Sequence, residues 1–244
     1  MKRKVPNSIE DPDTYSDTLR RYHKTLWSKP LPNGAAFDLE DYRSTPPYYL
    51  RHQSELGEFV LASDTVVPSF WKEKHIADVI KVLPPSEVGA FHTLGYTIGA
   101  MMVWPGNQVN RRMTINAARG CHPRIKDRFD LTVECIRRYY DDRSRRMNPY
   151  NPLGEVLHRY EDFFDLFGDF RGFVDFFLLQ DLVADDYSAV NFHAPFGKEE
   201  GEEEFKPYPF PGCIDTYRAY MQKASAFIEA RNQRILASIC DSCP

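Results

Sequence analysis

The sequence predicts an α+β fold, with a small, mainly antiparallel sheet in the N-terminal half and a largely helical C-terminal half. Residues 36–105 contain short extended runs rich in β-branched residues, such as "GEFVLASDTVV". After Gly106, apolar residues instead recur at helical spacing almost to the end of the chain. Because 42% of the 244 residues are hydrophobic, the chain can bury one sizeable core. We therefore expect a single domain over residues 1–244.

The first elements follow from caps and turn residues. Residues 1–14 are rich in Lys, Asp and Pro and predict a loose arm. Ser16 or Asp17 can cap a helix that runs to Trp27, and "SKPLPNG" then forces a turn. The alternating run "AFDLEDY" and the β-branched run after it predict two or more strands before residue 68.

The next two elements are a helix and a strand. An apolar stripe over 68–83 predicts a helix that "PP" ends. "FHTLGYTIGAMMVWPG" is the most strand-like segment of the chain, so it predicts a strand in the centre of the sheet that Pro-Gly closes.

Residues 113–240 predict the helical part. Thr114 can cap a helix that ends at Arg119, with Gly120 after it. Apolar stripes predict further helices over 123–140, 152–167, 170–184 and 217–240. Residues 197–212, "GKEEGEEEFKPYPFPG", are charged and broken by Pro and Gly, and predict an exposed acidic loop.

Membrane and metal sites have no support in the sequence. No apolar run reaches the roughly 18 to 20 residues of a membrane span, and no apolar segment follows the basic start. Five scattered Cys residues fit reduced thiols, so we expect a cytoplasmic protein. Cys240 and Cys243 have the spacing of half a zinc site, but there is no second pair, and their role stays open.

Charge is distributed unevenly along the chain. The segment from Asn107 to Arg146 contains eleven Lys or Arg residues and five acidic ones. The segment from Glu155 to Asp186 instead contains nine acidic residues and two Arg residues. One interpretation is structural: the Arg-rich stretch pairs with the Asp-rich helices, because buried carboxylates such as Asp175 and Asp181 need partners. Glu134 and Arg138, four residues apart, fit the same interpretation.

The functional interpretation keeps some of these arginines free. In "PGNQVNRRMTIN" a turn is followed by guanidinium groups, a hydroxyl and the start of a helix, which together suit a phosphate or carboxylate. The candidate ligand-binding residues are Asn107, Arg111, Arg112, Thr114, Asn116 and Arg119.

Catalytic candidates are fewer. The seven His residues include no metal-binding pair, and no hydrolase motif is present. His23 and Asp64 could form an acid/base pair if the fold brings them together. The competing interpretation makes His23 a buried, hydrogen-bonded residue of an amphipathic helix and Asp64 a turn or cap residue.

Two resemblances accompany these patterns. "TINAARGCHPRIKDRFDLTVECIRRYY", "FGDFRGFVDFFLLQDLVADDYS" and "LRRYHKTLWSKPLPNG" resemble a family of bacterial proteins of uncharacterised activity, over most of the chain. "YHKT", with His23, and "GEFVLASDT", with Ser63, resemble the first two elements of ADP-ribosyltransferase folds, which bind NAD. The third element, a strand with Glu, is missing; Glu87 and Glu134 are the acids left for that role.

These observations predict a bacterial cytosolic enzyme that acts on a phosphate-bearing ligand, a nucleotide or RNA. A toxin or phage-defence setting would suit such an enzyme. No cofactor is identified. One alternative is a non-catalytic interaction or regulatory protein that binds a protein partner through the acidic loop and the basic segment 143–146. The other is an NAD-dependent, ADP-ribosyltransferase-like toxin, with His23 and Glu134 as catalytic residues.

Overall fold

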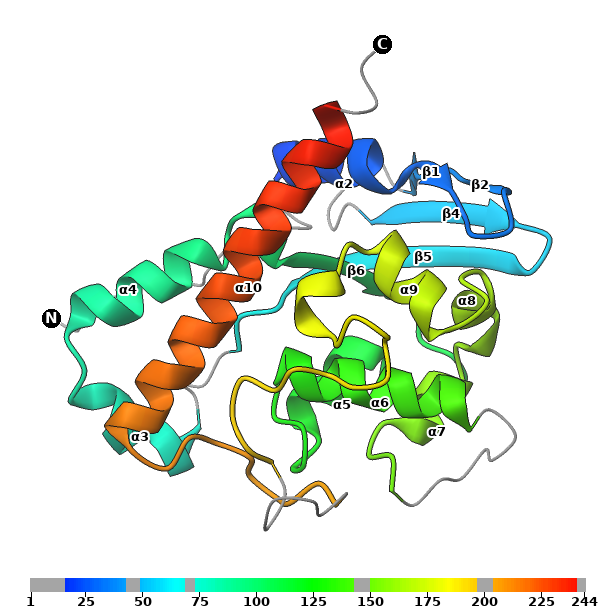
Figure 1. Cartoon of the computed structure of the whole chain (residues 1–244). Coiled ribbons are helices and arrows are strands. Elements are labelled where there is room, and N and C mark those ends of the chain that lie inside the picture. The colour runs from blue at the N-terminus through cyan, green and yellow to red at the C-terminus, as the bar shows by residue number, and fades with distance from the viewer. Residues whose placement is uncertain (1–15, 43–48, 69–72, 143–149, 197–203, 241–244) are drawn as a thin grey trace, which may run out of the picture.

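Two short antiparallel sheets and a helical block make up the computed structural model, which describes residues 16–42, 49–68, 73–142, 150–196 and 204–240 (Figure 1). The described strands all lie before Gly106 and helices dominate after it, so the α+β prediction is confirmed. Several predicted features lie outside the described residues: the arm over 1–14, the basic segment 143–146, most of the acidic run up to 203, and Cys243.

The strands belong to two sheets. In the smaller sheet, β1 (Lys29–Pro30) pairs antiparallel with β2 (Ala36–Phe37). The larger sheet has the order β3-β4-β5-β6 with antiparallel neighbours. Its strands are β3 (Glu40–Asp41), β4 (Leu50–Ser54), β5 (Gly57–Thr65) and β6 (Met101–Pro105).

The prediction for the segment before Gly106 was wrong in two ways. Only β6 is a strand, and it lies at an end of the described sheet rather than in its centre. All five β6 residues are nevertheless buried, because helices cover it. The residues before β6 form α4 (Pro85–Leu94) and the 3₁₀ turn η2 (Ile98–Ala100). A proline in the first turn starts α4.

Three of the helices predicted in the second half, over 123–140, 152–167 and 170–184, are shorter or divided in the structure, whereas α10 is longer than predicted. The helices other than α4 are α2 (Asp17–Trp27), α3 (Lys74–Lys81), α5 (Ile115–Cys121), α6 (Phe129–Asp141), α7 (Gly154–His158), α8 (Glu161–Asp165), α9 (Phe170–Phe176), the 3₁₀ turn η3 (Gln180–Leu182) and α10 (Ile214–Cys240). Ser16 caps α2 and Thr114 caps α5, as predicted.

Left-handed backbone explains the corrected boundaries. Lys126 and Asp127 have φ of 48° and 64°, so a helix cannot run from 123 to 140, and α6 starts at Phe129. Leu178 has φ of 55°, and the helix predicted over 170–184 therefore ends at Phe176. The helix predicted over 152–167 is divided into α7 and α8.

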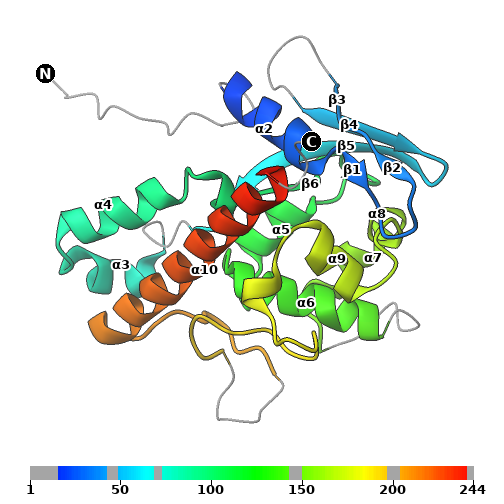
Figure 2. The ribbon, with the colours of Figure 1, turned by 45° about the horizontal axis from the view of Figure 1, so that its top comes forward.

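The last helix, α10, joins the parts of the molecule. It runs diagonally between α4 on one side and the helical block on the other (Figures 1 and 2). Its crossing with η2 is so close that a Cβ on Gly99 would lie 2.6 Å from the Ile228 carbonyl oxygen. The Gly99 N–H also donates to Asn232 Oδ1 at 2.8 Å. Only glycine fits this crossing without a shift of the backbone.

The described end of the acidic segment is partly exposed, as at Glu204 and Tyr208, and partly attached to the core. Phe205 is buried, and the Arg138 guanidinium lies 4.8 Å from its ring centroid. The Pro209 carbonyl accepts a hydrogen bond from the buried Arg128 at 2.9 Å. Aromatic and proline residues thus attach residues 205–211 to the core, although charged residues precede them.

Candidate functional site

Arg119, the most C-terminal member of the predicted anion site, is a fully buried structural residue. Its Nη1 lies 2.5 Å from Asp64 Oδ2 and 3.0 Å from Asp127 Oδ1, and its Nη2 donates to the Asp127 carbonyl at 3.2 Å. The pKa of Asp64 is raised to about 6, because burial and Asp127 outweigh Arg119, which opposes the rise. Arg119 therefore holds β5 to the turn before α6 and does not face a ligand cavity.

Arg112 and Asn107 also have internal partners. Arg112 forms an ion pair with Glu155 of α7, which Arg159 also contacts at 3.2 Å. The Asn107 carbonyl accepts a hydrogen bond from the Tyr160 hydroxyl at 2.8 Å. These contacts attach the 106–114 turn to the α7–α8 region.

The remaining members of the predicted anion site differ in exposure. Thr114 Oγ1 accepts from the Ala117 N–H at 3.3 Å, as a helix cap. Arg111 is exposed, with φ of 58°. Asn116 Oδ1 is buried and accepts no hydrogen bond from the described residues. These positions do not form a shared cavity with Arg119. The predicted anion site therefore lacks Arg119, which was to be its principal cation.

The three predicted catalytic residues are likewise engaged in internal contacts. His23 is fully buried in α2, and its Nδ1 accepts from Trp27 Nε1 at 3.1 Å. Burial and the nearby Arg231 lower the pKa of His23 to about 3, so the imidazole is neutral. Glu134 in α6 forms ion pairs with Arg137 at 2.8 Å and Arg138 at 2.7 Å.

The expected partnership between the Arg-rich stretch and the Asp-rich helices is mostly absent from the described residues. Its arginines pair largely within their own segment, as Arg128 does with Asp130 at 2.5 Å. Asp181 binds Arg234 of α10, and Asp175 accepts from Gln180 and Tyr187. The carboxylates therefore do have partners, as physical chemistry requires, but these come from elsewhere.

A cavity beside β1 is lined by charged residues that the sequence did not mark as a candidate site. It has a volume of about 480 Å³ and lies between the β1 turn and α9. That volume is within the range of small-molecule sites. Its charged lining residues are Lys29, Arg171, Asp169 and Asp175; apolar side chains including Leu31 and Phe176 complete the wall.

Lys29 is the most perturbed group in this cavity. Its Nζ lies 4.7 Å from the Phe176 ring centroid and 5.2 Å from that of Trp27. Burial and the neighbouring Arg231 lower the pKa of Lys29 to about 8, and Asp175 opposes that shift only in part. Among the described residues, no carboxylate lies within 4 Å of its ammonium group.

Arg231 lies behind Lys29 on the same aromatic ring. Its guanidinium is 5.6 Å from the Trp27 centroid and fully buried. It donates to the carbonyls of Phe177, Gly99 and Met101 at 2.9 to 3.1 Å. No carboxylate among the described residues pairs with it. Two neighbouring cations thus lack an anionic partner, an arrangement that is costly in a buried setting.

The other charged groups of the cavity have defined contacts. Arg171 stacks over the Tyr187 ring at 4.5 Å. Asp169 caps α9 by accepting from the Gly172 N–H at 2.7 Å. Asp175 accepts from Tyr187 at 2.6 Å and from Gln180 at 2.9 Å. The carboxylates are therefore oriented by protein donors, while Lys29 and Arg171 are not neutralised by an ion pair within the described chain.

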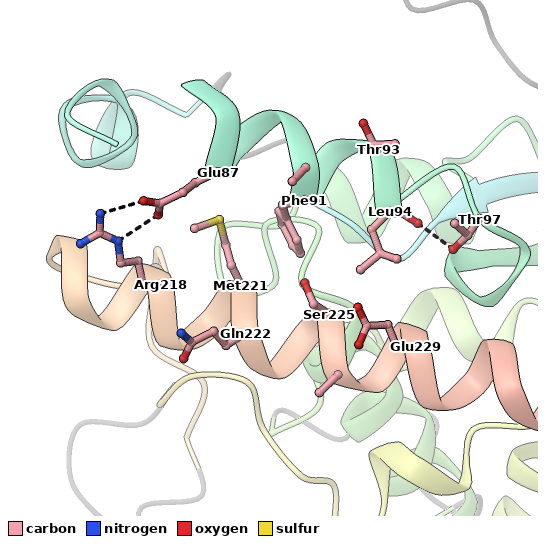
Figure 3. A pocket seen from close by; sticks show the side chains of 12 residues that line it. Glu87, Phe91, Thr93, Leu94, Thr97, Arg218, Met221, Gln222, Ser225 and Glu229 are labelled. Atoms are coloured by element: carbon pink, nitrogen blue, oxygen red, sulfur yellow. Dashed lines mark hydrogen bonds and ion pairs between the residues drawn. The ribbon is translucent and has the colours of Figure 1, made fainter. Parts of the chain in front are cut away.

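A hollow of larger volume lies elsewhere, between α4 and α10 (Figure 3). It has a volume of about 930 Å³ and a mainly apolar floor that includes Phe91, Leu94 and Met221. An ion pair at 2.9 Å between Arg218 and Glu87 crosses one end. It holds no uncompensated buried charge. It therefore has fewer groups suited to binding or catalysis than the cavity beside β1, which is named the Lys29 cavity after its most perturbed residue.

Part of the Lys29 cavity could have been found from the sequence. Arg231 follows Phe227 by four residues and precedes Ile235 by four, so it falls on the apolar face of α10. An arginine on such a face signals a buried cation. Lys29 gives no comparable signal, because its surroundings come from α9 and α10, far away in the sequence.

The fold and this cavity define an α+β protein with a small-molecule-sized pocket whose charged lining residues are two cations and two carboxylates. A family model described as a family of unknown function (DUF6994) matches residues 2–235, nearly the whole chain. The chain belongs to this family. No match was found among curated proteins or among solved structures. In the described part of the chain, no helix has the length and apolarity needed to cross a membrane.

Proposed function

We propose that the chain is a bacterial cytosolic enzyme that binds a small phosphate-bearing ligand of the nucleotide class in the cavity between β1 and α9. One observation carries the proposal: Lys29 and Arg231 contact the same Trp27 ring, and neither has a carboxylate partner among the described residues. A phosphate in the cavity would pair directly with Lys29, which lines it, while Arg231, fully buried behind Trp27, would act on the phosphate only as a nearby charge.

The rest of the cavity fits the rest of such a ligand. Arg171 adds a guanidinium, the group best suited to a phosphate. Asp169 and Asp175 can accept hydrogen bonds from hydroxyl or amino groups, which nucleotides also carry. The Phe176 ring offers an apolar surface beside the cations.

Lys29 is our candidate for proton transfer. A lysine whose pKa lies at about 8 can donate or accept a proton near neutral pH, which an ordinary lysine does poorly. Perturbed groups inside a cavity are typical of active sites. A cytosolic location is part of the proposal; Cys121, Cys135 and Cys213 are free thiols, as a reducing compartment would keep them.

The two alternatives from the sequence gain less support. An ADP-ribosyltransferase would need His23 and Glu134 at a shared NAD site, but His23 is bonded to Trp27 inside the core and Glu134 to arginines of its own helix. A toxin or phage-defence role rests on context alone. An interaction protein would need the acidic loop exposed, whereas part of its described end packs on the core.

The test is a thermal-shift screen with ATP, GTP, NAD, short RNA and inorganic phosphate. Wild type would be compared with Lys29→Met, Arg171→Met and Arg112→Ala, and with Arg124→Met as a control at an exposed arginine. We expect a nucleotide to raise the wild-type melting temperature, with the shift lost in Lys29→Met and Arg171→Met only.

Other outcomes of the thermal-shift screen would contradict the proposed site or favour an alternative function. A shift that survives both cavity variants but disappears in Arg112→Ala would move the site to residues 107–119 and contradict the proposal. If none of the probes changed the melting temperature, the result would favour the interaction protein.

A further inference from the structure

The Lys29 side chain presents a free amine to the Lys29 cavity. Within the described part of the chain, its Nζ forms no hydrogen bond and no ion pair. The residue is half-buried and lines the cavity, and its Nζ is not among the unpaired nitrogens that the fold closes off from solvent. A ligand in the cavity can therefore reach this atom.

The surroundings of Lys29 favour the uncharged form of the amine. The wall beside it is aromatic, with Nζ 4.7 Å from the Phe176 ring centroid and 5.2 Å from that of Trp27. These ring faces attract an ammonium, yet they replace only part of the hydration that it loses. The Arg231 guanidinium, 5.6 Å from the Trp27 centroid, repels a second positive charge.

Asp175 is the carboxylate that works against this effect. It favours the charged lysine, but its Oδ1 already accepts from the Tyr187 hydroxyl and from Gln180. Burial and Arg231 outweigh it and lower the pKa of Lys29 to about 8. About a tenth of the amine is then neutral at pH 7, compared with less than about a thousandth for an ordinary lysine.

A desolvated lysine beside a second cation is well suited to attack a carbonyl group. The lone pair of the neutral Nζ forms a bond to the carbonyl carbon, and the π electrons of the C=O bond move to the oxygen. The oxygen takes up the two protons of the amine and leaves as water while the C=N bond forms. This condensation needs no oxidant and no reductant.

Arg171 can hold a second part of the same ligand. Its guanidinium lines the cavity, stacks over the Tyr187 ring at 4.5 Å and has no ion pair within the described chain. A guanidinium suits a phosphate group. The imine formed at Lys29 keeps a positive charge when it is protonated, so the phosphate of a reacted ligand still has a cation at that position.

We propose that the Lys29 amine forms an imine with a small aldehyde or ketone that carries a phosphate group, and that Arg171 holds this phosphate. The inference rests on the proposed function for the placement of a phosphate in this cavity. It adds a covalent bond and a carbonyl-bearing class of ligand. A nucleotide has no aldehyde or ketone group, so it would compete for the cavity without reacting.

The experiment measures the covalent adduct directly. Full-length protein is incubated at pH 7 with glyceraldehyde 3-phosphate and sodium cyanoborohydride, and peptide mass spectrometry gives the modified fraction of each lysine. We expect Lys29 to react saturably, and about tenfold or more faster than Lys74, an exposed lysine. Propanal, an aldehyde without a phosphate, should need about a tenfold higher concentration.

Three variants separate the two parts of the site. Lys29→Arg keeps a cation but has no amine that can form an imine, so it should lose the fast adduct and keep a thermal shift with inorganic phosphate. Arg171→Met should slow the reaction of glyceraldehyde 3-phosphate about tenfold, the loss of one charge-assisted contact, and leave that of propanal unchanged. Arg124→Met, at an exposed arginine, should change neither reaction.

The outcomes distinguish this inference from the proposed function. A Lys29 adduct that forms no faster than that of Lys74 would overturn it, and this comparison within wild type does not depend on any variant folding. Equal reaction of propanal and glyceraldehyde 3-phosphate would overturn the phosphate-bearing class. A nucleotide shift without the adduct would leave the proposed function standing alone; the adduct without any nucleotide shift would support the imine and contradict the nucleotide class.

Discussion

At the scale of single residues, Lys29 makes the proposed function dependent on pH. Its pKa of about 8 is lowered from an ordinary value of 10.5, so the ammonium that would bind phosphate disappears above pH 8. Affinity for a nucleotide, whose phosphate is largely dianionic above pH 7, should fall about twofold between pH 7 and 8 and then approach a tenfold fall per pH unit. Isothermal titration calorimetry from pH 7 to 9.5 measures this.

Lys29→Met is the matching control for that titration. It should bind weakly at every pH and show no fall centred at pH 8, although the buried Arg231, whose pKa burial lowers to about 9, remains in place. If wild-type affinity stayed flat through pH 9, Lys29 would not be the phosphate-binding cation.

Arg119 tests the competing structural interpretation at the same scale. Arg119→Ala would leave Asp64 and Asp127 close together without their shared guanidinium. We expect the free energy of unfolding to fall by about 3 kcal/mol or more, as when one member of a buried pair is removed. Urea denaturation measures it, and Arg124→Ala, at an exposed position, should change it by less than about 0.5 kcal/mol.

A stable Arg119→Ala variant would contradict this reading of the structure. It would mean that the two carboxylates find other partners or take up a proton, which the raised pKa of Asp64 makes easier than for an ordinary aspartate.

At the scale of elements, caps and uninterrupted amphipathic stripes were reliable guides. They predict α2 nearly to the residue, because Ser16 caps it, and they predict the end of α10 at residue 240, although α10 begins three residues before the predicted start at 217. The failures share a physical cause. Apolar residues around Phe91 resemble a strand, yet they form α4 because that helix packs on α10, a contact between residues distant in sequence.

Positive φ values caused the other errors. The turns at Lys126, Asp127 and Leu178 interrupt stripes that look continuous, and these residue types do not mark a left-handed conformation as glycine would. The candidate site was missed for a similar reason. Lys29 becomes unusual only because α9 and α10 bring Phe176 and Arg231 next to it.

Gly172 gives a prediction for α9, which forms one wall of the Lys29 cavity. A Cβ at this position would lie 2.1 Å from the Phe167 carbonyl oxygen and 3.0 Å from Pro32. Gly172→Ala should therefore destabilise the protein by about 1–3 kcal/mol, the cost of overpacking, and disturb ligand binding. Thermal and urea unfolding measure the first effect.

The matched control is Gly120→Ala in α5. Nothing lies within 4 Å of a Cβ at Gly120, and its backbone is helical. This variant should gain about 0.5–1 kcal/mol, because alanine is the better helix former. Opposite signs at the two glycines are expected; a loss of stability in both would show that the space around Gly120 is not open.

At the scale of the whole molecule, the charge blocks of the sequence do not act as two halves that attract each other. Most described arginines of the basic stretch bind neighbours in their own segment, and the acidic helices take their partners partly from α10, as Asp181 does from Arg234. Counting charges along the sequence therefore identifies which groups need partners, but not which partners they find.

What unites the molecule is a continuous apolar core with Arg231 at a junction. Buried residues from both halves of the chain, including Phe37, Trp104 and Phe177, belong to one cluster. The Arg231 guanidinium binds the carbonyls of Gly99 and Met101 at the start of β6 and that of Phe177 after α9. Strands and helical block therefore share contacts that neither could satisfy alone.

The predicted single domain then requires one cooperative unfolding transition. Because the sheet-rich part and the helical part share the α10 crossing and the core, neither should remain folded after the other unfolds. Calorimetric and van't Hoff enthalpies should agree, and far-UV circular dichroism should give the same midpoint as the fluorescence of the three tryptophans, of which Trp27 and Trp104 are buried in the core. Two separate transitions would instead divide the chain into domains, most naturally between β6 and α5, and would place the Lys29 cavity at an interface between them.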